Sequence, residues 1–311
     1  MPSHFEAQLR AAGLTAGAAA AKAAMFARLA RAWDERSAAP PAGAWFVPGR
    51  IELLGKHTDY AGGRSLLCAV ERGFCLLAGP RAGGRVRLYD AGWPAEAEFA
   101  WNAKAAPPAG APWAIYAATV TRRLTLDFPE VLSGASPGAG PGADLVFVSD
   151  LPRAAGLSSS SALVVASLLG LTAAAGVAVN LGGREAMAEY LAAVESGRAW
   201  RGQSGGAGVG THGGSEDHTA ILCCRPGHWS QFRFCPVRPE SVVAAPADKQ
   251  LVVAVSGVAA AKTGCAQAAY NRAARMAAAI LAAWNAAAGR GDPTLGAALA
   301  SEPGALERVR A

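Results

Sequence analysis

A strand that leads through a serine-rich turn into an apolar helix is the feature that most constrains how this chain can fold. Residues 143–151 (ADLVFVSDL) are typical of a buried strand, and residues 156–176 (GLSSSSALVVASLLGLTAAAG) are typical of a Gly-Ser turn followed by a long apolar helix. Further strand-like and helical patterns alternate with these along the chain. This interleaving predicts a fold that mixes α-helices and β-strands.

The other segments are assigned from the same periodicity. Helices are expected from Lys262 to about Ala288 and at residues 5–34, 112–124 and 184–200. The Gly-rich segment 202–214 is a candidate hinge or interdomain junction. Strands are expected at residues 45–55, 64–79, 85–91, 220–224, 229–237 and 250–258.

Composition narrows the class of protein. Hydrophobic residues make up 52% of the 311 residues and charged residues 17%, as in a globular chain. The net charge of +6 favours an anionic ligand such as a nucleotide, but there is no Lys/Arg block of the kind that binds nucleic acid. No segment has the uncharged apolar length needed to cross a membrane. The six cysteines form no C-x-x-C pair, which indicates reduced thiols in a cytoplasmic protein.

Four consecutive serines at the start of the apolar helix predict a phosphate site. Gly156 permits a tight turn, and Ser158 to Ser161 then enter the helix. There the first backbone N–H groups have no partner within the helix, and the helix dipole is positive. One serine would be explained as an ordinary helix cap, but four in succession favour the binding of phosphate oxygens.

Two other stretches resemble nucleotide-binding motifs less well. Residues 49–56 have one residue too many between the glycines of a Walker A loop, and His57 stands where Ser or Thr should bind magnesium. Residues 208–213 match G-x-G-x-x-G, but they do not follow a strand-like segment. A flexible Gly-rich loop explains them better.

Two motifs together resemble those of a known kinase family. Residues 49–63 (GRIELLGKHTDYAGG) resemble the galactokinase signature. Residues 151–163 (LPRAAGLSSSSAL) resemble the ATP-binding motif shared by the GHMP kinases, which comprise galacto-, homoserine, mevalonate and phosphomevalonate kinases. Residues 112–120 (PWAIYAATV) resemble a Trp-x-x-Tyr helix near the nucleotide, and residues 256–275 resemble a later segment whose tyrosine touches the sugar.

This resemblance implies an α+β, GHMP-kinase-like fold of two domains with the active site between them. The N-terminal domain is expected at residues 1–200. A partial C-terminal domain is expected at residues 201–311, because nothing after residue 275 resembles the family's third, Gly-rich motif.

The implied activity is ATP-dependent phosphorylation of a monosaccharide at its anomeric hydroxyl. The acceptor would be galactose or a related sugar such as galacturonate, the cofactors ATP and Mg²⁺, and the protein a monomer or weak homodimer. One alternative is a non-catalytic sensor that binds sugar and ATP, which the missing third motif favours. Another is a kinase for a different small alcohol, of the homoserine or mevalonate type.

The resemblance also implies roles for individual residues. Arg50 would be the catalytic arginine and Asp217, in residues 213–220 (GGSEDHTA), its partner carboxylate, with Glu216 as the neighbouring alternative. Asp217 could accept the proton of the sugar hydroxyl or orient it, while Arg50 stabilises the transferred group and holds Asp217 ionised. The implied sugar contacts are Lys56, His57, Asp59, Gly214 and Tyr270. The implied ATP contacts are Gly156, Leu157, Ser158, Ser159, Ser160 and Ser161.

Ser160 and Glu195 would be the magnesium ligands, since a hard cation prefers oxygen. Glu195 could instead be a solvated helix acid, and Tyr270 a half-buried helix tyrosine. His212 lies in the Gly-rich insertion and is read as a loop residue that could reach a phosphate or the sugar.

Lys56 is the main departure within the sugar motif, because the family usually has glutamate there. Lysine can only donate hydrogen bonds and carries the opposite charge. Two hypotheses follow. The substrate could carry a carboxylate at that end, as a uronic acid does, or Lys56 could turn outward.

Overall fold

The computed structural model describes residues 2–132, 141–152, 155–246, 248–249, 251–254 and 265–310. Its strands are β1 Gly43–Leu54, β2 Arg64–Arg81, β3 Arg85–Asp90, β4 Ala95–Ala100, β5 Gly142–Ser149, β6 His228–Arg233 and β7 Arg238–Ala244. Its α-helices are α1 Pro2–Ala11, α2 Ala16–Asp34, α3 Ile115–Asp127, α4 Ser159–Ala175, α5 Arg184–Ser196, α6 Glu216–Cys223, α7 Cys265–Ala288, α8 Leu295–Leu299 and α9 Ala305–Arg310. Three short 3₁₀ turns are η1 Asp59–Ala61, η2 Pro112–Ala114 and η3 Pro129–Leu132.

The described strands form a seven-stranded sheet built around the long strand β2. Its order is β4-β3-β5-β2-β6-β7, and β1 pairs with β2 along most of its length. The second half of β2 pairs with β5, and its first half pairs with β6. Only β3 and β5 run parallel among the pairs described. The first residues of β2 therefore lie between the end of β1 on one side and β6 on the other.

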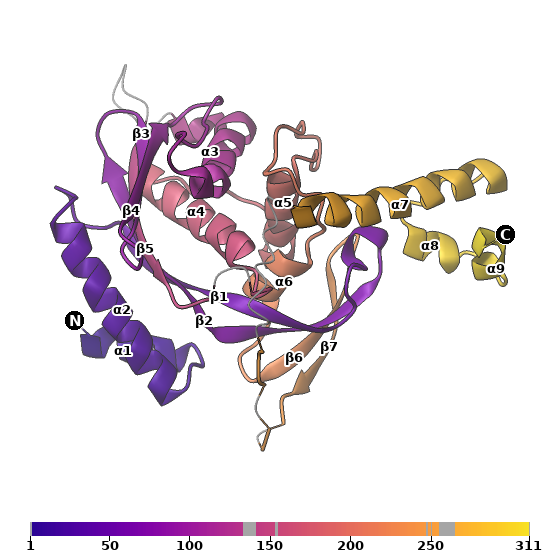
Figure 1. Cartoon of the computed structure of the whole chain (residues 1–311), viewed down its shortest axis with the longest axis horizontal. Helices are drawn as coiled ribbons and strands as arrows, with labels where there is room; N and C mark the ends of the chain where they lie inside the picture. The colour runs from indigo at the N-terminus through magenta and orange to yellow at the C-terminus, as the bar shows by residue number, and fades with distance from the viewer. Residues whose placement is uncertain are drawn as a thin grey trace.

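Helices cover both faces of the larger part of the sheet (Figure 1). Alternate residues of β5 point to opposite faces, as the pleat requires. Leu145 and Phe147 pack under α3, α4 and α5, whereas Val146 and Val148 pack against α2. A strand buried on both faces reads as a continuous apolar run, which is why residues 143–151 contain so few polar side chains.

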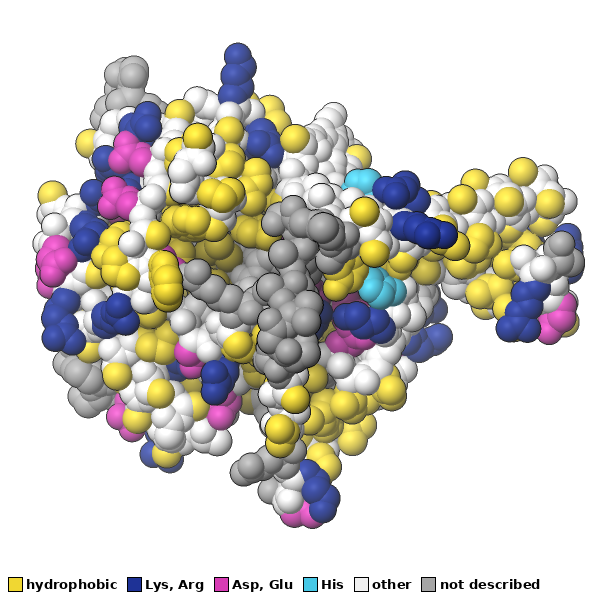
Figure 2. All heavy atoms as spheres, in the orientation of Figure 1, with side chains coloured by type: hydrophobic (Ala, Val, Ile, Leu, Met, Phe, Trp, Pro, Cys, Tyr) yellow, Lys and Arg dark blue, Asp and Glu magenta, His cyan; other side chains and the backbone are white. Residues whose placement is uncertain are grey.

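The segments after α5 extend this sheet and then leave it. Strands β6 and β7 continue the sheet beyond β2, so hydrogen bonds cross the predicted domain boundary at residues 200–201. The two-domain division stays a prediction. Helices α7 to α9 project from the body as an arm (Figure 1), and hydrophobic side chains are exposed on its surface (Figure 2). Met276 and Ile280 of α7 are among them.

Most of the expected elements are confirmed, two depart from expectation for physical reasons, and two strands were missed. Residues 220–224 were expected to be a strand, but residues 220–223 lie in α6 and Cys224 follows its end, because a short apolar run is compatible with either structure and here the helix has already begun at Glu216. The expected helix 5–34 is two helices, separated by a turn that includes Gly13, whose φ is +98°. Strands β4 and β7 were not expected from the sequence.

The expected strand 250–258 is only partly testable. Residues 251–254 are not in a strand, and residues 250 and 255–258 lie outside the described residues. The first residues of the expected helix from Lys262 also lie outside them, and α7 begins at Cys265. Across the described part of the chain, no helix combines the length and the apolar character that a membrane span requires.

Leu76, in the middle of β2, provides a test of this core. Its side chain is 1% exposed, whereas that of Leu53 on β1 is 46% exposed. We expect Leu76→Ala to lower the free energy of unfolding by about 2–5 kcal/mol, because it removes buried methyl groups and leaves a cavity. Leu53→Ala, the matched control, should change it by less than about 0.5 kcal/mol. Urea unfolding of both variants measures the difference, and equal losses would contradict the described packing.

Candidate active site

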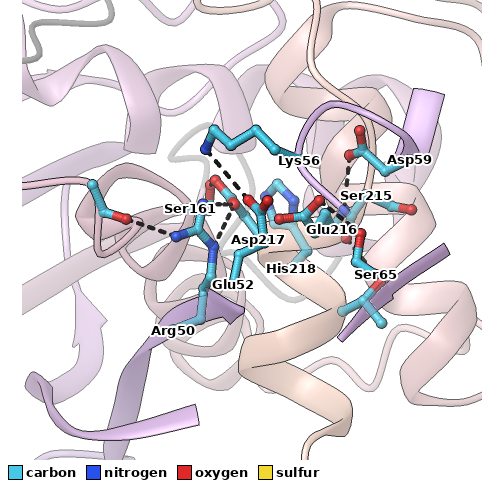
Figure 3. A network of polar contacts seen from close by, with 12 residues as sticks. Arg50, Glu52, Lys56, Asp59, Ser65, Ser161, Ser215, Glu216, Asp217 and His218 are labelled. Atoms are coloured by element: carbon cyan, nitrogen blue, oxygen red, sulfur yellow. Dashed lines mark hydrogen bonds and ion pairs between the residues drawn. The ribbon is translucent and has the colours of Figure 1, made fainter. Parts of the chain in front are cut away.

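A pocket forms where the end of β1, the first turn of α4 and the first turn of α6 meet (Figure 3). The loop between β1 and β2, the end of α5 and the start of α7 complete its walls. We call residues Gly55–Tyr60 the acceptor loop. The pocket brings together all of the residues predicted to contact the sugar or to be catalytic, namely Arg50, Lys56, His57, Asp59, Gly214, Asp217 and Tyr270.

Arg50 and Asp217 form a buried ion pair at the centre of the pocket. Arg50 Nε donates to Asp217 Oδ1 at 2.8 Å, and Nη2 lies 2.6 Å from the same oxygen. Arg50 Nη1 also donates to the carbonyl oxygen of Gly156 at 2.6 Å. Burial alone would lower the pKa of Arg50, but the carboxylates of Asp217 and Glu216 outweigh it and the net pKa is raised. Arg50 therefore stays charged and ties β1 to both the serine turn and α6.

Ser161 links this ion pair to Glu195. Its hydroxyl lies 3.0 Å from Glu195 Oε2 and 3.2 Å from Asp217 Oδ2. Glu195 Oε2 is also 3.1 Å from His218 Nε2. Glu195 is buried, so the reading of it as a solvated helix acid is wrong. The serine beside Glu195 is Ser161, whereas Ser160 lines a neighbouring cavity; the predicted pairing of Ser160 with Glu195 stays a prediction.

The acceptor loop is held in a tight conformation over the pocket. Gly55 has φ +99° and His57 has φ 59°, in the left-handed region. Asp59 is buried, and its Oδ2 accepts from the backbone N–H of Glu216 at 3.1 Å. Burial raises the pKa of Asp59. The His57 ring lies 5.4 Å from the ring of Tyr270, which brings α7 to the edge of the pocket.

Lys56 lines the pocket and forms an ion pair with Glu52. Its Nζ lies 3.3 Å from Glu52 Oε2, and in Figure 3 the side chain reaches back over the pocket. The Lys56 side chain is 64% exposed, whereas that of Glu52 is 7% exposed. Glu52 was missed in the sequence, although it stands two residues after Arg50 in a strand and so shares a face with it.

The serine turn separates this pocket from a second, aromatic cavity. Ser159 and Ser160 line the second cavity together with Trp93, Trp113 and Tyr116. Ser158 lies on the other side and has φ 57°. Its hydroxyl is buried and has no hydrogen-bond partner among the described residues. A buried hydroxyl without a partner at a helix N-terminus is suited to a ligand oxygen.

The residues of the pocket do not form a closed metal cage. In the described parts of the chain, no group of three or more His, Cys, Asp or Glu side chains is placed to hold a metal ion. Mg²⁺ usually needs only one or two protein oxygens when phosphates and water complete its coordination. The carboxylate of Glu195 and the nearby serine hydroxyls fit that requirement.

Two family models match the chain in the segments that build this site. Residues 33–80 match the galactokinase galactose-binding signature, and residues 120–213 match the GHMP kinases N terminal domain. Among curated relatives, the galactokinase of Streptomyces coelicolor is 31% identical over 190 residues, which are 61% of this chain and 43% of that protein. The galactokinase of Actinobacillus pleuropneumoniae serotype 5b is 32% identical over 120 residues, which are 39% of this chain and 29% of that protein.

A solved structure supports the same fold. The structure of Lactococcus lactis galactokinase complexed with galactose superimposes with a TM-score of 0.52 and 23% identity, covering 68% of this chain and 52% of that one. The chain thus spans about half or less of the length of these relatives.

Gly214 offers a direct test of how the pocket is closed. A methyl group at Gly214 would overlap the Asp59 carboxylate and lie 2.8 Å from the backbone nitrogen of Tyr60, whereas one at Gly213 meets open space. We expect Gly214→Ala to lower the free energy of unfolding by about 1–3 kcal/mol, because Asp59 must shift. Gly213→Ala should change it by less than about 0.5 kcal/mol. Urea denaturation measures the free energy of unfolding of the two variants, and hydrogen exchange measures the protection of the acceptor loop in each. Equal results for Gly214→Ala and Gly213→Ala would contradict the close contact of Gly214 with Asp59.

Proposed function

We propose that this chain, which belongs with the GHMP kinases through its N-terminal domain and its galactokinase signature, transfers the γ-phosphoryl group of ATP to the anomeric hydroxyl of a neutral, galactose-like sugar. The observation that carries the proposal is the buried Arg50–Asp217 pair beside the serine turn, whose residues line one cavity on each side of the turn. One cavity would hold the nucleotide and the other the acceptor.

The aromatic cavity is the better place for the nucleotide. Trp113 and Tyr116 line it and can stack on a base, while Ser159 and Ser160 stand at its inner end. The free backbone N–H groups at the start of α4 and the hydroxyl of Ser158 would receive the phosphates. The terminal phosphoryl group would then point toward Arg50.

The pocket lined by Arg50 and Asp217, which we call the acceptor pocket, would supply a carboxylate and a cation for the transfer. Asp217 would accept the proton of the sugar hydroxyl, or orient it, as the hydroxyl oxygen forms its bond to the γ-phosphorus. The bond from that phosphorus to the bridging oxygen breaks, and ADP leaves with the electron pair. Arg50 would stabilise the negative charge on the transferred group, which is the main requirement of phosphoryl transfer.

Glu195 and the hydroxyl of Ser160 or Ser161 would hold Mg²⁺ together with the phosphates. When bound, the ion would neutralise charge on the β- and γ-phosphates.

The charges of the acceptor pocket favour a neutral sugar over a uronate. Lys56 is already paired with Glu52, so its charge is balanced within the protein. Asp59 also lines the pocket, and a substrate carboxylate would lie near this acidic group. Bringing like charges together costs several kcal/mol unless a cation intervenes.

The first test is ADP release by the purified chain with Mg-ATP and a panel of acceptors: galactose, galacturonate, homoserine and mevalonate. We expect turnover with galactose. Asp217→Asn and Arg50→Lys should each lower kcat by about 10²–10⁴-fold, because they remove the proton acceptor and the bidentate cation. Glu96→Gln, an exposed acid on β4, is the control and should leave kcat unchanged. ATP binding without turnover on any acceptor would favour the sensor, and turnover on homoserine or mevalonate would exclude a sugar kinase.

The Lys56–Glu52 pair leads to a second test of the substrate class. We expect Lys56→Gln to change the KM for galactose by less than about fivefold, since a partly exposed ion pair contributes about 1 kcal/mol or less. Galacturonate should be used at least about 100-fold less well than galactose, as kcat/KM, by both proteins.

The charge-reversed double variant Glu52→Lys with Lys56→Glu controls for loss of the pair itself. Efficient phosphorylation of galacturonate that disappears in Lys56→Gln would show that Lys56 binds a substrate carboxylate, contrary to the proposal.

A further inference from the structure

We propose that Glu216 is a positioning residue for the acceptor loop, and that its carboxyl group carries the proton that begins a hydrogen-bond chain through Ser65 to the carbonyl oxygen of Gly55. Its effect on sugar binding rests on the function proposed above. The hydrogen-bond chain itself does not.

Glu216 touches the acceptor loop at both of its ends. Its backbone N–H donates to Asp59 Oδ2 at 3.1 Å, at the far end of the loop. Its Oε2 lies 3.0 Å from Ser65 Oγ, and that hydroxyl lies 3.0 Å from the carbonyl oxygen of Gly55, where the loop begins. Figure 3 shows Glu216 between Ser65 and Asp217. One residue thus connects the acceptor loop to the helix that carries Asp217.

The number of protons in these contacts assigns a proton to Glu216. Ser65 is buried, and its hydroxyl has one proton for two oxygen neighbours at 3.0 Å. The carbonyl oxygen of Gly55 can only accept, so Ser65 donates to it if both contacts are hydrogen bonds. The contact with Glu216 then requires Glu216 to donate. The Thr58 hydroxyl lies 2.8 Å from the same Gly55 oxygen and 2.9 Å from the carbonyl oxygen of Arg64. It has one proton for these two acceptors, and a carbonyl oxygen has two lone pairs, so Ser65 can donate to Gly55 whichever contact Thr58 makes.

The charges around Glu216 also favour the protonated form. Burial, the neighbouring carboxylate of Glu52 and the charge of Asp59 together raise the pKa of Glu216 to about 9. Asp217, next in α6, acts in the same direction. The facing cations are already engaged, Arg50 with Asp217 and Lys56 with Glu52. From α5, Glu195 faces the pocket, with its Oε2 3.1 Å from His218 Nε2.

Loss of this proton would weaken the hold on the start of the acceptor loop, where the Gly55 carbonyl would keep only its contacts with Thr58, the hydroxyl at 2.8 Å and the N–H at 3.3 Å. A carboxylate at Glu216 accepts the Ser65 proton, so the Gly55 carbonyl loses that donor, and another negative charge appears beside Glu52 and Asp59. Gly55 packs closely on β2, where even a methyl group would lie 2.6 Å from Ser65 Cα. The residues that follow Gly55 include His57, which lies against Tyr270 at the mouth of the pocket. We therefore expect a change at Glu216 to alter the KM for the sugar and to leave the KM for ATP unchanged.

The test compares wild type, Glu216→Gln and Glu216→Ala over about pH 6 to pH 10. Glutamine keeps a donor toward Ser65 and does not titrate. In wild type we expect the KM for galactose to rise about tenfold as the pH passes one unit above 9, with the KM for ATP constant. Glu216→Gln should retain the neutral-pH KM within about threefold and lose the alkaline rise, whereas Glu216→Ala should raise KM at every pH by about fivefold or more. The proposal would be overturned if the KM of Glu216→Gln for galactose were as high as that of Glu216→Ala. It would also be overturned if the KM of Glu216→Gln rose at alkaline pH as much as that of wild type.

Stability against pH separates this inference from the proposed function. The folded protein holds the Glu216 proton at a higher pH than the unfolded chain, so wild type loses stability as the pH rises from about 4.5 to about 9. The Tm of Glu216→Gln minus that of wild type should therefore grow by roughly a few degrees over this range and then level off. The exposed-acid variant Glu96→Gln should show no such trend. If the Tm difference grows with pH but no acceptor is phosphorylated, the role of Glu216 stands and the proposed kinase function is wrong. If an acceptor is phosphorylated but the Tm difference does not grow, the kinase function stands and the role of Glu216 is wrong.

Discussion

The buried Arg50–Asp217 ion pair is the interaction on which the site depends. It joins residues 167 positions apart, one on strand β1 and the other in the first turn of α6. The same guanidinium also holds the serine turn through the carbonyl oxygen of Gly156. Removing one partner of a buried pair leaves an uncompensated charge, which is strongly destabilising. The positions of β1, the serine turn and α6 therefore depend on one another. The serine turn held in this way has residues that line both cavities, Ser158 and Ser161 on one side and Ser159 and Ser160 on the other.

The acceptor pocket contains more acidic groups than the two cations beside them can balance. Arg50 pairs with Asp217 and Lys56 with Glu52, while Asp59 is stabilised by hydrogen bonds from the backbone. The proton proposed on Glu216 would relieve the remaining repulsion without a third cation. An acid-rich, hydrogen-bonding pocket of this kind is suited to a hydroxylated, neutral ligand, which fits the galactokinase signature in the sequence.

Local sequence patterns predicted the elements better than they predicted the contacts. The buried strand 143–151 and the apolar helix after the four serines were evident, because two-sided burial and a helix start leave marks on neighbouring residues. Residues 220–224 were predicted incorrectly, because five apolar residues fit a strand as well as a helix. The choice between Ser160 and Ser161 beside Glu195 depends on how α4 is rotated against α5, which spacing along one helix does not fix.

The sequence by itself determined which chemical groups are available: a serine-rich helix start, an arginine at the end of a strand, and a pair of adjacent acids after a Gly-rich segment. Turn and cap preferences are local, so these could be read residue by residue. Only the tertiary structure decided that Asp217 rather than Glu216 meets Arg50, that Lys56 pairs with Glu52, and that Glu216 faces Ser65. The reason is physical: contacts between distant segments follow from the packing of β1, β2 and α6 around a shared core, and that packing is a property of the whole chain.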